Sequence, residues 1–197
     1  MAKKNGKTKE VSLFKLNLGS GPKNVEGFIA CDKEKHPNVK YVFDLGKDKW
    51  PFKNNSVDAA IAHHVIEHLT NWNGKFERVH FFNELYRVLK PDAVCEIVCP
   101  DWSSDRFWGD PTHMEPFGSM STQYLRKEWR KEQAPTVDYE ITPGRQSFKC
   151  DFEVSYGFTL NPSLTGRNQE YIQHAHTYDI NARMDFVGQF KKKAPTK

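Results

Sequence analysis

The chain has 197 residues, of which 38% are hydrophobic, 27% charged and 13% aromatic. This length suits one domain with a single core, and the aromatic content argues against disorder throughout. No run of hydrophobic residues exceeds four, which excludes a membrane-spanning helix and the apolar core of a secretory signal.

The formal net charge of +4 arises from the two ends of the chain. Residues 1–10 contain four lysines and one glutamate, residues 191–197 contain four lysines, and the remaining 180 residues carry a net charge of −3. We expect a disordered basic tail over 1–11, a single domain over 12–190 and a second basic tail over 191–197. Solvated termini explain these lysines, and a nonspecific tether to nucleic acid is the alternative.

The four cysteines predict a reducing compartment, and hence the cytoplasm, because none of them forms a C-x-x-C pair. Cys95 and Cys99 fall in a strand-like run and would share one buried face as small apolar groups. A zinc site built on them is not expected.

Short apolar runs over 14–18, 28–31, 39–43 and 57–62 predict four strands. Each run stops at a glycine-rich or polar residue. This pattern is typical of a parallel sheet whose site lies at the carboxyl ends of the strands.

A helix is predicted over 72–90 from apolar residues at three- and four-residue spacing, and Pro91 stops it. A fifth strand follows over 93–99, so the helix is the crossover of an α/β sheet. Beyond Pro100 we expect a long loop, a helix from 121 or 122 to about 133, and another loop. Strict alternation over 152–160 and again over 184–190 predicts an antiparallel pair at one sheet edge.

Three polar features follow the first three predicted strands in chain order: the segment Gly19-Ser20-Gly21, then Asp32, then Asp44. Glycines let a ligand approach the backbone closely. The Asp32 carboxylate can accept hydrogen bonds from two ribose hydroxyls, and the Asp44 carboxylate can accept one from an exocyclic amino group. This order predicts a nucleoside-containing ligand across the sheet edge. The alternative is that each aspartate caps its own strand.

NAD is disfavoured as that ligand. The dinucleotide fingerprint needs a third glycine where Asn24 stands, and an acid about 20 residues beyond the glycines. Asp32 follows Gly21 by only 11 residues.

The segment from Leu16 to Asp101 resembles class I S-adenosylmethionine-dependent methyltransferases. Five segments carry the resemblance: Leu16–Gly21, Asp32, Phe43-Asp44-Leu45, Trp50–Asp58 and His64–Leu69. A sixth, Asn83-Glu84-Leu85-Tyr86-Arg87-Val88-Leu89-Lys90-Pro91, is similar to the family's E-x-x-R-V-L-K-P run.

The chain departs from the family pattern at Asn17, at Asp92-Ala93, and over 22–27, where the usual first helix has no room. A compact branch of the family, related to methyltransferase type 11 and common in phage and polysaccharide gene clusters, shows the same shortening. Its Gly-Ser-Gly-Pro-Lys and Asp-Pro-Thr-His segments resemble 19–23 and 110–113 here.

The resemblance implies an α/β, Rossmann-like, mostly parallel seven-stranded sheet with an antiparallel last strand and helices on both faces. It implies methyl transfer from S-adenosylmethionine to an O or N nucleophile. The cofactor residues it suggests are Asn17, Gly19, Ser20, Gly21, Asp32, Asp44, Leu45 and His63. A substrate-side insertion over 101–146 would overhang the methyl group, and the candidate catalytic residues are His113, Asp101 and His64.

One competing motif is His64-x-x-Glu67-His68, which matches the H-x-x-E-H of inverted zinc peptidases. Such a peptidase needs the motif in a long helix, whereas here the apolar strand ends one residue before His64. We therefore interpret Glu67 and His68 as residues that position a helix beneath the ligand, and we expect no metal site.

Two other functions stay open: a noncatalytic S-adenosylmethionine-binding or scaffold protein, and a nucleic-acid methyltransferase tethered by the lysine tails. A small molecule or a glycan is the favoured acceptor, no membrane partner is expected, and the Asn/Asp-Pro-Pro-aromatic motif of amino-methylating DNA enzymes is absent.

Overall fold

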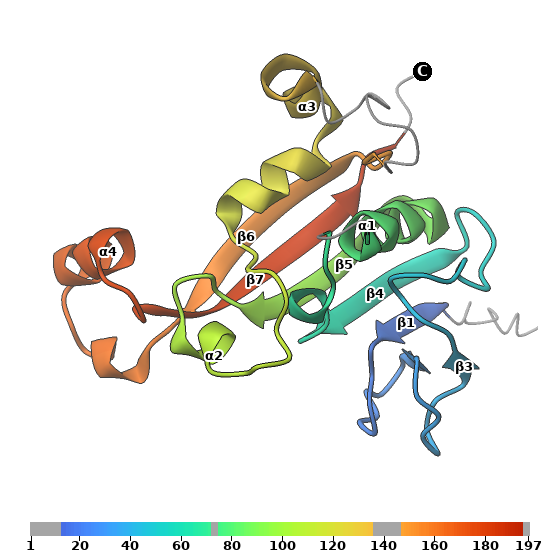
Figure 1. Ribbon diagram of the computed structural model, residues 1–197, viewed down its shortest axis with the longest axis horizontal. Helices are drawn as coiled ribbons and strands as arrows, with labels where there is room; N and C mark the ends of the chain where they lie inside the picture. The colour runs from blue at the N-terminus through green and yellow to red at the C-terminus, as the bar shows by residue number, and fades with distance from the viewer. Residues whose placement is uncertain (1–12, 72–74, 136–146, 195–197) are drawn as a thin grey trace, which may run out of the picture.

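The computed structural model describes residues 13–71, 75–135 and 147–194. Seven strands form one sheet in the order β3-β2-β1-β4-β5-β7-β6 (Figure 1). Within the described residues, no helix is long and apolar enough to cross a membrane. The tail predicted over 1–11 lies outside the described residues.

The first five strands are parallel, and β7 runs antiparallel to both of its neighbours. Their bounds are β1 (Lys15–Leu18), β2 (Ile29–Asp32), β3 (Tyr41–Val42), β4 (Val57–His63), β5 (Leu89–Pro100), β6 (Phe152–Leu160) and β7 (Arg183–Lys192). The prediction of a mostly parallel seven-stranded sheet with an antiparallel last strand is confirmed, as is the antiparallel pair at one edge.

The helices are α1 (Glu77–Val88), α2 (Asp105–Trp108), α3 (Lys127–Gln133) and α4 (Gln169–Tyr178), with 3-10 helices η1 (Ile66–His68), η2 (Ser119–Leu125) and η4 (Pro162–Leu164). The helix predicted to run from 121 or 122 to 133 is two pieces, because Arg126 between η2 and α3 has extended backbone. Helix α1 ends earlier than predicted because the chain enters β5 at Leu89.

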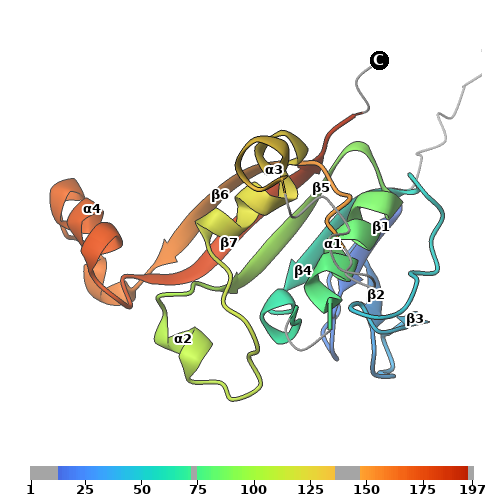
Figure 2. The same ribbon diagram turned by 45° about the horizontal axis from the view of Figure 1, so that its top comes forward.

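One face of the sheet packs against α1 and η2 and forms the core (Figure 2). Phe82 of α1 lies with its ring centroid 5.8 Å from that of Phe190 in β7 and 6.1 Å from that of Phe117. Cys31, Cys95 and Cys99 are buried free thiols and Cys150 is buried too, and burial raises the pKa of the Cys31 thiol to about 12.

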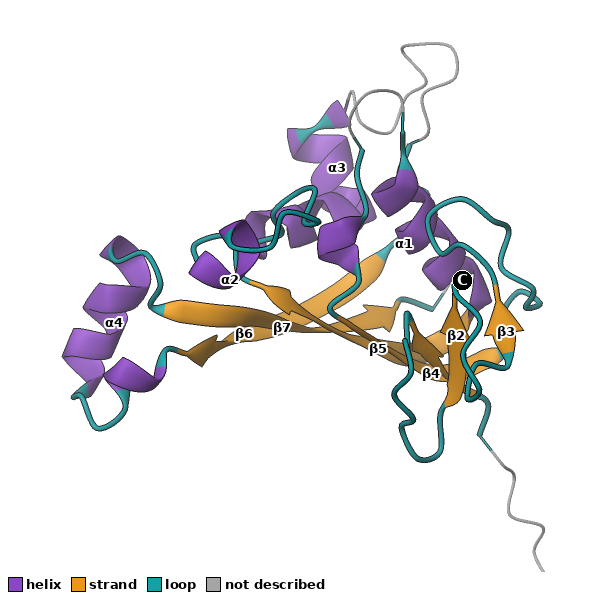
Figure 3. Cartoon of the chain, turned by 60° about the horizontal axis from the view of Figure 1, so that its bottom comes forward, coloured by secondary structure: helices purple, strands orange, loops and turns teal. Residues whose placement is uncertain are grey.

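The prediction of helices on both faces of the sheet is wrong for the described residues. Figure 3 shows α1, α2 and α3 on the same side of the sheet, and α4 beyond the ends of β6 and β7. The loops over 19–28 and 33–40 connect β1 to β2 and β2 to β3, and they are too short to cross the sheet as helices. Side chains on the other face are correspondingly accessible, with His63 42% and Glu96 37% exposed.

The C-terminal boundary also differs from the expectation of a tail over 191–197, because β7 continues through Lys192. Lys192 is buried, and its Nζ donates to Asn55 Oδ1 (2.7 Å), to the Tyr86 carbonyl (2.6 Å) and to the Leu89 carbonyl (2.9 Å). Burial lowers the pKa of Lys192. Lys191 points the other way and pairs with the exposed Asp92.

Lys192→Met should lower the melting temperature by roughly 5–10 °C, because removing charge-assisted hydrogen bonds to buried carbonyls costs about 2–3 kcal/mol. Lys191→Met is the matched control and should leave the melting temperature unchanged, since an exposed ion pair adds little. Equal melting temperatures for the two variants would contradict a structural role for Lys192.

Candidate functional site

A cavity of about 530 Å³ opens at the carboxyl ends of β1, β2 and β4. Its volume lies in the range of small-molecule sites. The residues that line it come from these strand ends, from η1, from α1 and from the segment after α2: Gly19, Asp32, Lys33, Asp44, Leu45, Lys47, His64, Val65, His68, Leu69, Glu77, Thr112 and Met114.

The loop after β1 folds back on β2 through backbone hydrogen bonds. The N–H groups of Gly19 and Ser20 both donate to the Cys31 carbonyl, at 2.8 and 3.1 Å. The Gly21 N–H donates to Asp32 Oδ2 (2.7 Å), and Asp32 Oδ1 accepts from the Glu34 N–H (2.9 Å). The Asp32 carboxylate is therefore fixed in orientation at the cavity wall, and each oxygen keeps a lone pair for a further donor.

Asp44 and Leu45 form the next part of the wall, after β3. Asp44 Oδ1 accepts from the Gly46 N–H (2.9 Å), and Oδ2 accepts from Lys47 Nζ (3.0 Å). Partial burial acts to raise the pKa of Asp44, but the hydrogen bonds from Lys47 and Gly46 outweigh it and hold the pKa below its ordinary value. Asp44 is thus an anion beside the apolar Leu45 side chain.

His63 and His64 at the end of β4 take opposite directions. His63 Nε2 lies 2.8 Å from Glu96 Oε1 on the helix-free face, and His63 does not line the cavity. His64 has a left-handed backbone (φ 56°), lines the cavity, and holds its Nδ1 3.3 Å from Glu67 Oε1. Interaction with the Glu67 carboxylate raises the pKa of His64 against the effect of partial burial.

The segment after β5 reaches the cavity through Thr112 and Met114, which flank His113. The His113 side chain is 8% exposed, its Nδ1 lies 2.8 Å from the Phe107 carbonyl, and its ring contacts His68 at 4.8 Å between centroids. The histidine beside His113 is thus His68, a residue predicted only to position a helix.

Four other predicted site residues do not line the cavity: Asn17, Ser20, Gly21 and Asp101. Asn17 is buried in β1, and Ser20 and Gly21 belong to the loop described above. Asp101 is fully buried, and its Oδ1 accepts from the Ser103 N–H and hydroxyl at 3.1 and 2.6 Å. These bonds fix the turn after β5.

The sequence motifs did not identify Lys47, Glu77, Thr112 or Met114 as lining residues. Lys47 and Glu77 form an ion pair across the cavity rim, with Nζ 3.5 Å from Oε1. The two residues lie thirty positions apart in different elements, and no local pattern marks such a pair.

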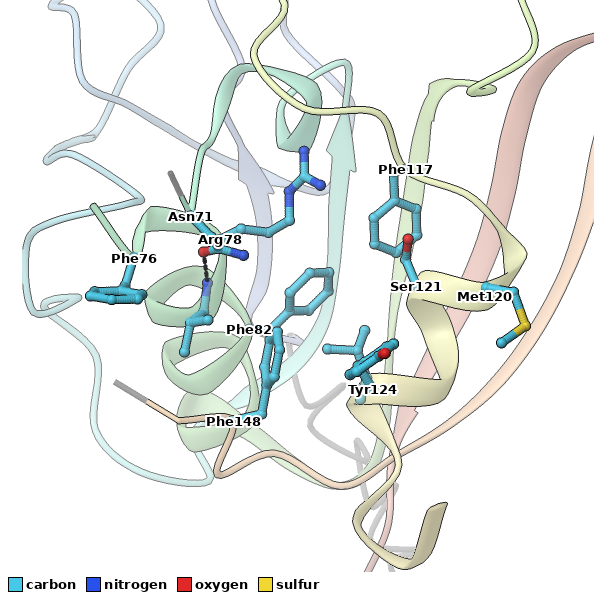
Figure 4. Close-up of a pocket in the computed structure, with 11 residues that line it drawn as sticks. Asn71, Phe76, Arg78, Phe82, Phe117, Met120, Ser121, Tyr124 and Phe148 are labelled. Carbon is cyan, nitrogen blue, oxygen red and sulfur yellow. Dashed lines mark hydrogen bonds between the residues drawn. The ribbon is translucent and has the colours of Figure 1, made fainter. Parts of the chain in front are cut away.

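A second pocket of about 400 Å³ lies between α1 and η2, and Figure 4 shows its aromatic lining. The Asn71 amide oxygen and the Arg78 Nη atoms in its lining are engaged within the protein. Asn71 Oδ1 accepts from the Val79 N–H (3.1 Å), and Arg78 donates to backbone carbonyls. The cavity at the strand ends therefore offers the more versatile polar groups for a ligand.

Comparison with known proteins agrees with this geometry. Residues 23–97 match the family model described as a methyltransferase domain. No curated protein matches the chain.

Solved structures match the whole fold at low identity. One is a SAM-dependent methyltransferase from Archaeoglobus fulgidus (TM-score 0.59, 16% identity, covering 91% of this chain and 86% of that one). Another is a SAM-dependent methyltransferase from Methanosarcina mazei (TM-score 0.51, 14% identity, covering 92% of this chain and 92% of that one). A third is the Burkholderia thailandensis 1,6-didemethyltoxoflavin-N1-methyltransferase, solved with 1,6-didemethyltoxoflavin and S-adenosylhomocysteine. Its TM-score is 0.52 at 10% identity, and the match covers 92% of this chain and 71% of that one.

The solved structures that share this fold include enzymes of the S-adenosylmethionine-dependent methyltransferase class, and residues 23–97 match the methyltransferase domain in sequence. The described sheet as a whole has the fold of that class. The resemblance inferred from the motifs is confirmed.

Gly19→Ala should destabilise the protein more than Gly21→Ala, by about 1–3 kcal/mol. Both glycines have positive φ (69° and 52°), so alanine costs backbone strain at either position. At Gly19, however, the new Cβ would clash with Val65 Cγ2, whereas nothing lies within 4 Å of a Cβ at Gly21. Denaturant unfolding of the two variants checks this, and equal stabilities would show that Val65 does not restrict the loop.

Proposed function

We propose that this chain binds S-adenosylmethionine in the cavity at the strand ends and transfers its methyl group to an O or N nucleophile. The observation that carries the proposal is the wall formed by Gly19, Asp32 and Asp44. It takes one residue from the end of each of three neighbouring strands, in the order that a nucleoside requires.

The chain's residues fit the parts of such a ligand. Gly19 presents no side chain, so a ligand can approach the backbone there. The fixed Asp32 carboxylate can accept both ribose hydroxyls, since each of its oxygens so far holds one backbone N–H. The Asp44 carboxylate can accept a hydrogen bond from the exocyclic amino group of a base, while the Leu45 side chain packs against that base. Three carboxylates, those of Asp32, Asp44 and Glu77, share the lining with two lysines, Lys33 and Lys47.

When bound, S-adenosylmethionine supplies an electrophilic methyl group. The protein's task is then to hold the acceptor in line with that methyl and to exclude water. The segment that contributes Thr112 and Met114 covers this side of the cavity. His64 is half-exposed at the cavity wall, so its imidazole can take the proton that an O or N acceptor loses during attack.

The proposed acceptor is a small molecule or a glycan, because the cavity is of small-molecule size. The buried thiols of Cys31, Cys95 and Cys99 support a reducing compartment, and we place the protein in the cytoplasm.

Isothermal titration with S-adenosylmethionine, S-adenosylhomocysteine and NAD tests the proposal. Wild-type protein should bind the first two and not NAD. Asp32→Asn should weaken binding tenfold or more, because a hydrogen bond to a charged acceptor contributes ~1.5–3 kcal/mol.

Asp58→Asn is the matched control. The Asp58 carboxylate also accepts a backbone N–H, from Phe14 at 2.8 Å, but it lies at the amino end of β4. The Asp58→Asn variant should bind S-adenosylmethionine with the same affinity as the wild type. Unchanged affinity in folded Asp32→Asn would remove Asp32 from the site, and binding without transfer to any O or N acceptor would favour the noncatalytic alternative.

A further inference from the structure

Two segments remote in sequence bring three metal-binding side chains together beside the cavity. Glu67 and His68 belong to η1, after β4, and His113 lies in the loop after α2. One candidate ligand atom from each residue lies within 4.8 Å of those of the other two. The contact between the segments is fixed by the Met114 N–H, which donates to the Glu67 carbonyl at 2.8 Å.

Both imidazoles are held with Nδ1 as the donor. His113 Nδ1 lies 2.8 Å from the Phe107 carbonyl, which can only accept. His68 Nδ1 lies 3.2 Å from the Thr112 carbonyl and 3.3 Å from Thr112 Oγ1, whose own proton goes to Asp110 Oδ1. In a neutral imidazole held this way, Nε2 is the nitrogen left to bind a metal. His113 Nε2 also lies 3.7 Å from Asp110 Oδ2.

Glu67 supplies a negative charge beside the two imidazoles. Its side chain is 1% exposed, and neither carboxylate oxygen receives a hydrogen bond from the described residues. His64 Nδ1 lies 3.3 Å from Oε1, and the nearby Arg78 guanidinium donates instead to the carbonyls of Ile66, Glu115 and Pro116. The His64 imidazole offsets part of the cost of burying this carboxylate, and a metal cation beside it would offset more.

We propose that Glu67, His68 and His113 bind one divalent transition-metal ion at the wall of the cavity. Two imidazoles and one carboxylate form a ligand set that suits zinc and similar ions, and three protein ligands leave a coordination position open. His68 lines the cavity, so that position is accessible to an acceptor oxygen or to water. The site does not rest on the proposed methyl transfer.

This inference replaces the sequence-based expectation that no metal is bound. That expectation weighed two pairs of residues, Cys95 with Cys99 in one strand and His64 with His68 on one helix. In the structure η1 spans Ile66–His68, so it does not hold the two histidines on one helical face. The third ligand, His113, comes from a segment 45 positions further along the chain.

The test is titration of untagged, chelator-treated and dialysed full-length protein with Zn²⁺ and, separately, with Mg²⁺. We expect about one Zn²⁺ per chain, a higher melting temperature in its presence, and no comparable binding of Mg²⁺, which prefers all-oxygen sites. Glu67→Gln, His68→Ala and His113→Ala should each weaken Zn²⁺ binding tenfold or more.

Two controls make the test specific. His36→Ala, at a histidine on the loop after β2, should bind Zn²⁺ as the wild type does. His64→Ala should also retain binding, which separates this site from an H-x-x-E-H pair. Circular dichroism establishes which variants fold, and the exposed His68 ring provides a variant that leaves the core intact.

Three results would overturn the proposal. They are absence of Zn²⁺ binding by the wild type, unchanged binding in every folded ligand variant, and loss of binding in His64→Ala without loss in His113→Ala. Titration of the chelator-treated protein with S-adenosylhomocysteine reports on the cavity separately, so failure of the metal site and failure of the proposed function can be distinguished.

Discussion

Arg78 reaches from α1 to three backbone carbonyls, with Nη2 donating to Ile66 (2.8 Å) and Glu115 (2.6 Å) and Nη1 donating to Pro116 (3.1 Å). The guanidinium is buried, and this burial lowers its pKa. Its hydrogen bonds connect the turn after β4 to the segment after α2, the two parts that build the far wall of the cavity. Without them, the carbonyls of Glu115 and Pro116 would lose a charged donor, and the Ile66 carbonyl would keep the Leu69 N–H at 3.2 Å. The loss of these charge-assisted bonds would cost stability.

Cationic side chains that bind backbone carbonyls recur throughout the described domain. Arg87 donates to the carbonyls of Trp50 and Phe52, and Arg130 donates to those of Tyr124 and Cys150. Lys192 does the same at the end of β7. Each of these cations lies where irregular chain meets a helix or strand. Irregular backbone needs donors that regular elements supply to themselves, and a fold with long loops obtains them from side chains.

The strands could be predicted from the sequence because alternation and terminal polar residues are local signals. Gly19, Asp32, Asp44, Leu45 and His64 could likewise be proposed as neighbours, since parallel strands bring their carboxyl ends to one edge. They line the cavity, while their roles toward a ligand stay predictions.

What could not be predicted depends on contacts between distant segments. The partnership of His113 with His68 requires the path of the chain between α2 and η2, which no periodicity encodes. Lys192 looked like part of a charged tail because its sequence neighbours are lysines, yet its Nζ faces three oxygen acceptors. The helix-free face of the sheet differs from the family-based expectation because two connections are short.

A crystal structure with S-adenosylhomocysteine tests the central claim most directly. The account predicts the ribose hydroxyls on Asp32, the base beside Asp44 and Leu45, and the sulfur on the side of His64. A ligand seated between α1 and η2, or one at the strand ends with its ribose away from Asp32, would contradict it.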